Sequence, residues 1–304
     1  MPRTMDRHPH FLPLMAALLG VACLSLMDAF MKGAALAAGA YSAAVLRSAI
    51  GAGMVAPVWW LRGGKWPNNH VLRLHLLRGT VSAFMALSFF YSLTKLPIAE
   101  AIAISFIAPL IALYLAAVLL GETIRRQAVV ASLLGFAGTL VIIGGRLGTA
   151  ESDMETLKGL AAILFSAVLY AWNFVIIRKQ ALVSSPLEAT TFHSGVSFAA
   201  LALFAPWFFA IPESRVILDT AMAAALTVFG AMAVTWAYAR AEAQVLVPIE
   251  YSGFVWACLF GWLFFAEGVT PTTLAGTMLI VTGCWIATRS RPEQVSVQPP
   301  DIPA

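Results

Sequence analysis

The chain has 304 residues, of which 60% are hydrophobic and only 11% are charged, and its mean hydropathy is +0.84. This composition excludes an ordinary soluble domain, because one aqueous core cannot hide so much apolar surface. The formal net charge is +4, but the basic residues lie in short segments beside apolar runs. That distribution is typical of a membrane protein and argues against nucleic acid as a partner.

Apolar stretches of about 20 residues recur along the whole chain, and a helix of that length crosses a hydrocarbon core of about 30 Å. We therefore predict an all-α polytopic membrane protein with ten transmembrane helices. A cleaved signal peptide is the alternative for the first stretch, since Arg3 and Arg7 precede it. The predicted spans are residues 11–31, 41–61, 72–93, 98–119, 127–145, 158–177, 189–210, 217–238, 245–265 and 271–288.

The distribution of Lys and Arg predicts the orientation. If the N-terminus is cytoplasmic, twelve basic residues fall in inside segments and five in outside segments. This asymmetry places both termini in the cytoplasm of a multi-pass inner-membrane protein. The inside residues are Arg3, Arg7, Arg62, Lys65, Arg73, Arg125, Arg126, Arg178, Lys179, Arg240, Arg289 and Arg291, and the outside residues are Lys32, Lys95, Arg146, Lys158 and Arg215.

An internal repeat emerges when the chain is aligned with itself at a shift of 145 residues. Asp28 then falls on Asn173, Glu122 on Glu267 and Gly138 on Gly283. Each repeat has five spans, so the second copy must enter the membrane from the other side, as in many secondary carriers. The predicted segments are a cytoplasmic N-terminus (1–10), repeat one (11–145), an outward-facing linker (146–157), repeat two (158–288) and a disordered cytoplasmic tail (289–304).

Several short motifs resemble the EamA-type branch of the drug/metabolite transporter superfamily. The motifs are Asp28 with Lys32, Arg47, Arg78-Gly79, Tyr91-Ser92-Leu93 with Pro97, Ser105, Pro109, Gly121-Glu122, Pro248-Ile249-Glu250-Tyr251-Ser252 and Glu267. The resemblance implies ten helices, two EamA repeats, and a central cavity lined mainly by spans three, four, eight and nine. Pro109 has no counterpart at Phe254, so we expect the two fourth-type helices to bend differently.

Charged side chains within the spans are the first candidates for a functional site, because such residues usually face a cavity or a partner. Arg78 is expected to hold an anionic group such as a carboxylate. Glu250 is expected at a similar depth, where it meets a cation or carries a coupling proton. The two residues either form an ion pair or bind opposite ends of a zwitterionic substrate. Snorkelling to the inner interface is the structural alternative.

Asp28, Lys32 and Arg47 fall in the outer half of the spans and are assigned to gating or coupling. Asp28 and Lys32 are spaced i,i+4, so a salt bridge between them is expected, with Arg47 as a further partner. His193, in the inner half, is either a proton relay or a hydrogen-bonded helix contact. Asn173, the repeat mate of Asp28, could offer a neutral donor and acceptor to a substrate.

Aromatic residues are candidates for a wall that stacks on a planar or apolar substrate. The predicted substrate-binding residues are Arg78, Tyr91, Ser105, Asn173, Trp236, Tyr238, Glu250 and Tyr251. Trp256 is a further aromatic candidate, whereas Glu122 and Glu267 are assigned to helix ends, since Thr270-Pro271 after Glu267 is typical of a helix start.

The function that the sequence favours is a secondary carrier for a small metabolite, with amino acids, S-adenosylmethionine and riboflavin left open by the resemblance. A membrane-embedded enzyme, a channel and a non-transporting subunit are the alternatives. An enzyme would need a clustered nucleophile and base or metal ligands, and the sequence shows none. No cofactor or metal is predicted, and no loop ending in Gly-Lys-Ser or Gly-Lys-Thr is present for ATP. A proton or an exchange substrate is the expected energy source.

The predicted topology can be tested at the linker between the repeats. In intact cells, a cysteine introduced as Ser152→Cys should react with a membrane-impermeant maleimide, because the linker is expected outside. The unsubstituted protein, whose own cysteines lie within apolar runs, is the control. Labelling that requires the cells to be opened would overturn this orientation.

Overall fold

The computed structural model describes residues 11–108, 110–112, 114–115, 126–147, 153–181, 183–238, 240, 249 and 251–288. The first half contains α1 (Phe11–Ala38), α2 (Ala40–Leu61), α3 (Asn69–Leu93), α4 (Ile98–Ser105) and α6 (Arg126–Leu147). The second half contains α7 (Met154–Ala181), α8 (Pro186–Ala202), α9 (Ala205–Phe208), α10 (Ser214–Tyr238), α12 (Ser252–Phe265) and α13 (Pro271–Thr288). The predicted all-α membrane fold is confirmed, and each predicted span overlaps one of these helices.

Five of the described helices, α1, α2, α3, α7 and α10, are long and apolar enough to cross a membrane. The seventh predicted span is broken in two, because α8 ends at Ala202 and the short α9 follows. The spans at 98–119 and 245–265 run partly through residues outside the described ranges. Linker residues 148–152, the predicted N-terminal segment and the C-terminal tail also lie outside them.

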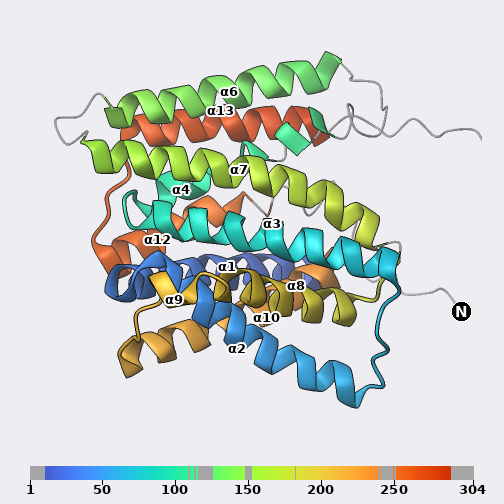
Figure 1. Ribbon diagram of the computed structural model, residues 1–304. Coiled ribbons are helices and arrows are strands. Elements are labelled where there is room, and N and C mark those ends of the chain that lie inside the picture. The colour runs from blue at the N-terminus through green and yellow to red at the C-terminus, as the bar shows by residue number, and fades with distance from the viewer. Residues whose placement is uncertain are drawn as a thin grey trace, which may run out of the picture.

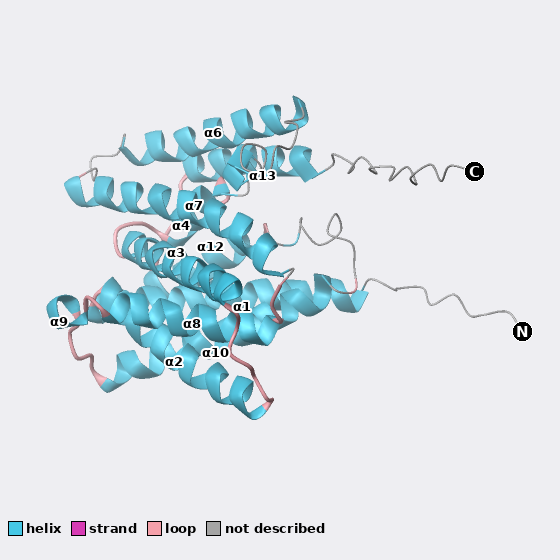
Figure 2. Cartoon of the chain, turned by 45° about the vertical axis from the view of Figure 1, so that its right-hand side comes forward, coloured by secondary structure: helices cyan, strands magenta, loops and turns pink. Residues whose placement is uncertain are grey.

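Contacts between the helices follow the two-fold pattern expected of a repeat. α1 packs along α10, and the equivalent helices α7 and α3 pack along each other. α6 packs on α13, α2 on α8 and α4 on α12, so each of these pairs joins a helix to its own repeat mate. In Figures 1 and 2, the pair α6 and α13 forms one edge of the bundle and α2 lies toward the opposite edge.

The two repeats run in opposite directions. Near the end of α1, Lys32 donates a hydrogen bond of 2.7 Å to the carbonyl of Leu96, just after α3. Lys95 beside it pairs at 2.6 Å with Glu155 in the first turn of α7. α1 therefore ends at the side where α7 begins, which is the relation an inverted repeat requires. We refer to this side as the outer end and to the other as the inner end, following the predicted orientation.

The exposed surface is apolar, as lipid-facing helices require. On α6, Leu133, Phe136 and Leu140 are 63%, 58% and 52% exposed. The opposite face of the same helix is buried and carries Gly138 and Ile142. A soluble helix would bury the large side chains and expose the small ones. This reversal indicates that α6 packs inward through small residues and presents its large residues to hydrocarbon.

Local sequence explains where several helices begin. Asn68 accepts a hydrogen bond of 3.0 Å from the Val71 amide and caps α3. Thr270 caps α13 ahead of Pro271 by accepting from the Thr273 amide at 3.1 Å, so the predicted helix start is confirmed. Asp153 caps α7, and the bond from the Thr156 backbone amide lowers the pKa of Asp153.

Glycine decides how closely α6 and α13 approach. A methyl group at Gly138 would lie 2.5 Å from the carbonyl oxygen of Gly276 and 3.1 Å from the amide nitrogen of Ile280. Both are backbone atoms of α13, so a side-chain rotation cannot relieve the clash. This small-residue contact between the two helices is therefore internal to the chain.

Substitution of Gly138 should therefore destabilise the α6–α13 pair. We expect Gly138→Ala to cost about 1–3 kcal/mol of stability through overpacking, measured as a lower thermal midpoint of the purified protein in detergent. Gly144→Ala on the same helix is the matched control, because nothing lies within 4 Å of its added methyl group. Equal midpoints for the two variants would contradict the close contact.

Candidate substrate-binding site

Four ionisable side chains from four helices form a central polar cluster: Asp28 on α1, Arg47 on α2, Arg78 on α3 and His193 on α8. The charges of Asp28 and Arg47 interact, and His193 lies within electrostatic reach of both arginines. The expected separation into an outer layer with Arg47 and an inner layer with Arg78 and His193 is therefore wrong, because α8 brings the two layers together.

Close crossings of α8 with its neighbours explain how the cluster assembles. A methyl group at Gly79, next to Arg78, would lie 2.5 Å from Val196, and the Ser197 hydroxyl donates a 2.9 Å hydrogen bond to the Gly79 carbonyl. A methyl group at Gly51, one turn after Arg47, would lie 3.5 Å from the Ser194 hydroxyl. Both arginines are thus carried to the same turn of α8.

The cluster retains unused hydrogen-bonding capacity. The Nε atoms of Arg47 and Arg78 and the Nδ1 atom of His193 are buried and have no hydrogen-bond partner among the described residues. Arg47 also packs its guanidinium 5.0 Å from the ring centroid of Phe90. Buried polar atoms are nearly always satisfied in folded proteins. These atoms are therefore positioned to receive groups that the described protein does not supply.

Arg78 has one described hydrogen-bond partner, because its Nη1 atom donates to Oε1 of Gln180 on α7. Glu250 lies outside the described residues, so its predicted pairing with Arg78 stays a prediction. Asn173, also on α7, is buried and accepts a 3.3 Å hydrogen bond from Ser82 on α3, one turn beyond Arg78. Asn173 therefore borders the cluster through Ser82, and its predicted contact with a substrate stays a prediction.

The other predicted binding residues are scattered. Ser105 donates at 2.9 Å to the Ala101 carbonyl of its own helix. Trp236 is 39% exposed, and the guanidinium of Arg240 lies 4.1 Å from its ring centroid at the inner end. Tyr251 packs edge-on against Phe106 with ring centroids 5.4 Å apart. The side chain of Tyr238 lies outside the described part of the structure.

Trp256 on α12, named above as an aromatic candidate, stacks on Phe260 with ring centroids 6.0 Å apart. Its Nε1 atom and the Ser252 hydroxyl one turn earlier are buried without a hydrogen-bond partner among the described residues. α12 therefore also presents unused polar atoms in its first two turns. Ser252 stands in the motif that carries the family resemblance.

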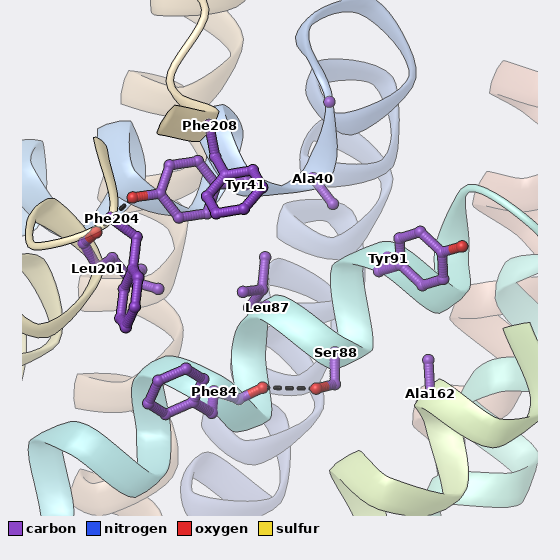
Figure 3. Close-up of a pocket in the computed structure, with 11 residues that line it drawn as sticks. Ala40, Tyr41, Phe84, Leu87, Ser88, Tyr91, Ala162, Leu201, Phe204 and Phe208 are labelled. Carbon is purple, nitrogen blue, oxygen red and sulfur yellow. Dashed lines mark hydrogen bonds between the residues drawn. The ribbon is translucent and has the colours of Figure 1, made fainter. Parts of the chain in front are cut away.

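Tyr91 lines a pocket of about 560 Å³ near the outer end, shown in Figure 3. Tyr91 lies thirteen positions after Arg78, so their side chains lie about 140° apart around α3 and about 20 Å apart along it. The pocket is therefore distinct from the central cluster, and its walls suit an apolar group. Its lining residues are Gly39, Ala40, Tyr41, Phe84, Leu87, Ser88, Tyr91, Ala162, Leu201, Phe204 and Phe208.

Lys32 makes a different ion pair from the one predicted. Its ammonium group pairs with Glu267, between α12 and α13, rather than with Asp28 in the preceding turn of α1. The second oxygen of Glu267 accepts a 2.8 Å hydrogen bond from the Ile98 amide at the start of α4. We call Lys32, Leu96, Ile98 and Glu267 the outer clasp. It holds the outer parts of α1, α4 and α12 together.

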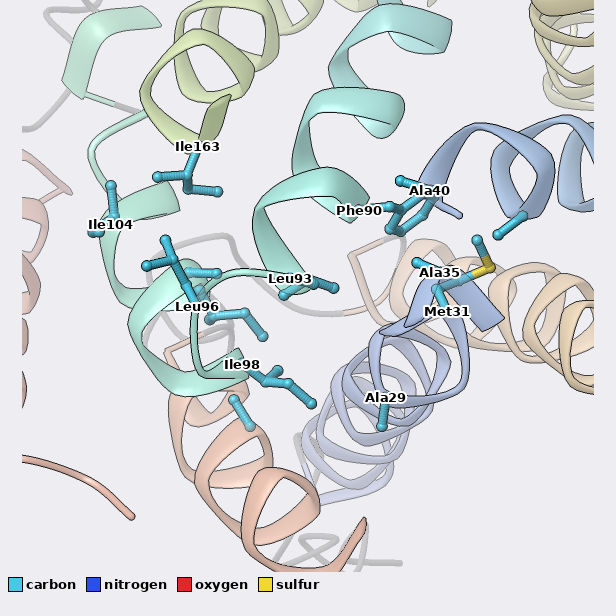
Figure 4. Packing of buried hydrophobic residues seen from close by; sticks show 14 of the residues in the cluster. Ala29, Met31, Ala35, Ala40, Phe90, Leu93, Leu96, Ile98, Ile104 and Ile163 are labelled. Atoms are coloured by element: carbon cyan, nitrogen blue, oxygen red, sulfur yellow. The ribbon is translucent and has the colours of Figure 1, made fainter. Parts of the chain in front are cut away.

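The outer clasp lies beside the largest hydrophobic core. Leu96 and Ile98 are fully buried in a cluster with Met31 and Leu93, as Figure 4 shows. Burial beside apolar side chains strengthens an ion pair whose hydrogen bonds are all made, but it makes a lone charge costly. Glu267 is thus more than a helix-end residue, because it binds two other segments as well.

Glu100 on α4 was missed by the sequence interpretation. It is buried, with one oxygen 3.4 Å from the Thr273 hydroxyl and the other 3.8 Å from Nε of Arg146. It follows Ile98 by two residues and therefore adds a second carboxylate near the outer clasp. In the sequence, the indication of a buried carboxylate was that Glu100 lies among apolar residues just after Pro97. Within the described residues, no group of His, Cys, Asp or Glu side chains is arranged to hold a metal.

Breaking the outer clasp should be costly. We expect Lys32→Met to destabilise the protein by about 3–5 kcal/mol, because it strands Glu267 as a buried charge. Adding Glu267→Gln should restore part of the loss, since the amide oxygen can still accept from Ile98. The measurement is the thermal midpoint in detergent.

The control for this pair is Lys158→Met. Lys158 pairs with Glu155 at 2.6 Å, but its side chain is 52% exposed, so we expect a change within about 0.5 kcal/mol. A clasp variant as stable as this control would show that the Lys32–Glu267 pair contributes nothing.

Comparisons with known proteins give the family. The model of the EamA-like transporter family matches residues 11–144 and 157–289. The pseudopaline exporter of Pseudomonas aeruginosa is 26% identical over 277 residues, which cover 90% of this chain and 95% of the exporter. The S-adenosylmethionine uptake transporter of Rickettsia prowazekii is 27% identical over 212 residues, or 68% of this chain and 69% of that protein.

One crystal structure matches with a TM-score of 0.59 at 24% identity, covering 90% of this chain and 96% of the other. That likeness shows the fold alone. The relatives are named as transporters of small molecules, and the family match extends over both halves of the chain. This multi-pass membrane protein therefore belongs to the EamA-like transporter family.

Proposed function

We propose that this protein is a secondary carrier that moves a small organic metabolite with an anionic group across the inner membrane by alternating access. The observation that supports it is the central polar cluster, in which Arg47, Arg78 and His193 present buried nitrogens that no described residue hydrogen-bonds. Asp28 supplies the carboxylate of this cluster. Two guanidinium groups and one carboxylate leave the cluster with an excess of positive charge for a ligand.

The chemistry of the cluster suggests what that ligand carries. Guanidinium groups bind carboxylates and phosphates through parallel N–H donors. Asn173 and Ser82, one turn beyond Arg78, add neutral groups that suit an amine or a hydroxyl. A metabolite with a carboxylate and a further polar group, such as an amino acid or S-adenosylmethionine, meets both requirements. Transport of S-adenosylmethionine by a relative makes this compound the first to test.

The outer clasp has a place in the proposed cycle. It joins α1, α4 and α12 at the outer end, and an outward-open state would have to separate these helices. We take the clasp as closed when the binding site faces inward, with both termini cytoplasmic. A proton or an exchanged substrate would supply the driving force. Asp28 and His193 are the titratable members of the cluster.

The proposal can be tested on the purified protein. Thermal shifts with S-adenosylmethionine, the protein amino acids and riboflavin would select ligands, and flux into proteoliposomes of radiolabelled compounds would establish transport. Flux above that of protein-free liposomes, saturable and blocked by excess unlabelled compound, supports a carrier. A protein that shifts with ligands but moves none of them would instead be a non-transporting binding subunit.

Arg47 should contribute directly to binding of the transported anion. We expect Arg47→Gln to raise the half-saturating concentration about tenfold or more, because a hydrogen bond to a charged group contributes about 1.5–3 kcal/mol. Arg240→Gln is the control, since Arg240 is exposed and stacks on Trp236 at the inner end. Wild-type affinity in the Arg47 variant would remove this residue from the site.

A further inference from the structure

A chain of hydrogen bonds leads away from Arg78 through three other side chains. The Nη1 atom of Arg78 donates to Oε1 of Gln180. The Nε2 atom of Gln180 lies 2.5 Å from Nδ1 of His75, and Nε2 of His75 lies 3.0 Å from Oε1 of Glu188. The four residues come from α3, α7 and α8. The chain therefore links the central cluster to the first turn of α8 at the inner end.

The direction of every hydrogen bond in this chain is determined by its two ends. An arginine side chain can only donate, so the oxygen of the Gln180 amide must face Arg78 and its NH₂ group must face His75. His75 then accepts at Nδ1, which leaves the proton of the neutral ring on Nε2. That proton is donated to the carboxylate of Glu188. A single arrangement of donors and acceptors thereby accounts for all three hydrogen bonds.

The two middle residues of the hydrogen-bond chain are buried away from water and held by packing. His75 is 0% and Gln180 2% exposed. The His75 ring stacks on Phe192 with a centroid distance of 4.6 Å and an interplanar angle of 11°. Glu188 is anchored in the first turn of α8, whose start is capped by Ser185, and a carboxylate is favoured there by the helix dipole. The His75 ring and the Glu188 carboxylate are therefore held in place.

The partner that contacts Arg78 is a neutral amide, although a carboxylate of the same length would fit the same position. A carboxylate would neutralise Arg78, whereas an amide holds the guanidinium in place and leaves its charge available. The Nε atom of Arg78 remains buried without a described partner. We infer that Gln180, His75 and Glu188 are positioning residues that aim a still-charged Arg78 at the anionic group of the substrate. This inference rests on the proposed function for the identity of that group.

A purely structural role for Gln180 makes a different prediction from a positioning role. If the amide only stabilises the bundle, Gln180→Glu and Gln180→Leu should both loosen Arg78. If the neutral acceptor matters, the two substitutions should act in opposite directions. The glutamate would pair with Arg78 and sequester it, whereas the leucine would release it.

Modification by phenylglyoxal, followed by mass spectrometry of the Arg78 peptide, distinguishes the two roles without any substrate. The reagent attacks the unprotonated guanidine, so a carboxylate at position 180 should slow modification of Arg78 about tenfold. Gln180→Leu should accelerate it severalfold, by about the strength of one hydrogen bond. The exposed Arg62 in the same protein is the internal reference.

The part of the hydrogen-bond chain beyond Gln180 is tested with a matched pair of histidines on α3. His75→Phe preserves a ring against Phe192 but removes both hydrogen bonds, so Arg78 should again be modified severalfold faster. His70→Phe is the control, because His70 is exposed in the first turn of the same helix. This pair also keeps the inference testable if neither Gln180 variant folds.

Three results would overturn the inference. The first is a change in the same direction for both Gln180 variants, and the second is equal rates for the two histidine variants. The third is an unmodified Arg78 in the wild-type protein under conditions that modify Arg62, since the Arg78 guanidinium would then not be open to a small molecule. Absence of flux in proteoliposomes would count against the proposed function alone, because these rates require no transport.

Discussion

The high free-energy cost of an unpartnered charge within a membrane governs the arrangement of this protein. Three of the cations in the described helices meet that cost in three ways. Lys32 is paired with the carboxylate of Glu267. Arg47 has the opposite charge of Asp28 and the ring of Phe90 beside it, and Arg78 has the neutral amide of Gln180. A cation held by a fully bonded carboxylate is suited to fastening helices, whereas one held by an amide keeps its charge for a ligand. The chemistry of the partner therefore separates the residues of the outer clasp from those of the proposed site.

Packing between the repeats limits how the proposed carrier can move. Two extensive helix contacts, α1 with α10 and α3 with α7, each join a helix of one repeat to a helix of the other. Between α1 and α10 the backbones meet at Gly20 and Gly230, where a methyl group on either residue would lie 2.9 Å from the carbonyl oxygen of the other. Inverted repeats suggest a motion in which one repeat rocks against the other as a rigid unit. Such a motion would break both pairs, so we expect the moving units to contain helices from both repeats.

The elements that sequence reasoning identified correctly are those dictated by the bilayer. Span positions follow from hydrophobic length, and the repeat follows from the matched positions of Asp28 and Asn173. Partners were harder to assign, because Lys32 can be neutralised equally well by Asp28 four residues away or by Glu267 in the other repeat. Only the fold decides between them. Gln180 and His75 were missed for a different reason. A neutral polar side chain within a membrane costs less free energy than a charged one, so it is a weaker indication of a functional site. Their spacing from Arg78 becomes informative only once α3 and α7 are known to be neighbours.

The two repeats share a fold but do not carry the same charged residues at equivalent positions. At the shift of 145 residues that relates the repeats, Glu267 corresponds to Glu122, but Lys32 corresponds to Ile177. An isoleucine cannot form the ion pair that closes the outer end, so the inner end has no copy of the outer clasp built on that position. Alternating access between two symmetric arrangements would give two states of similar free energy. Because the Lys32–Glu267 pair supports the outward-closed state and Ile177 cannot supply its counterpart, we expect the two states of the proposed cycle to differ in free energy without ligand. Binding of the anion to Arg47 and Arg78 would then have to offset that difference, since a ligand shifts such an equilibrium only by its differential affinity for the two states.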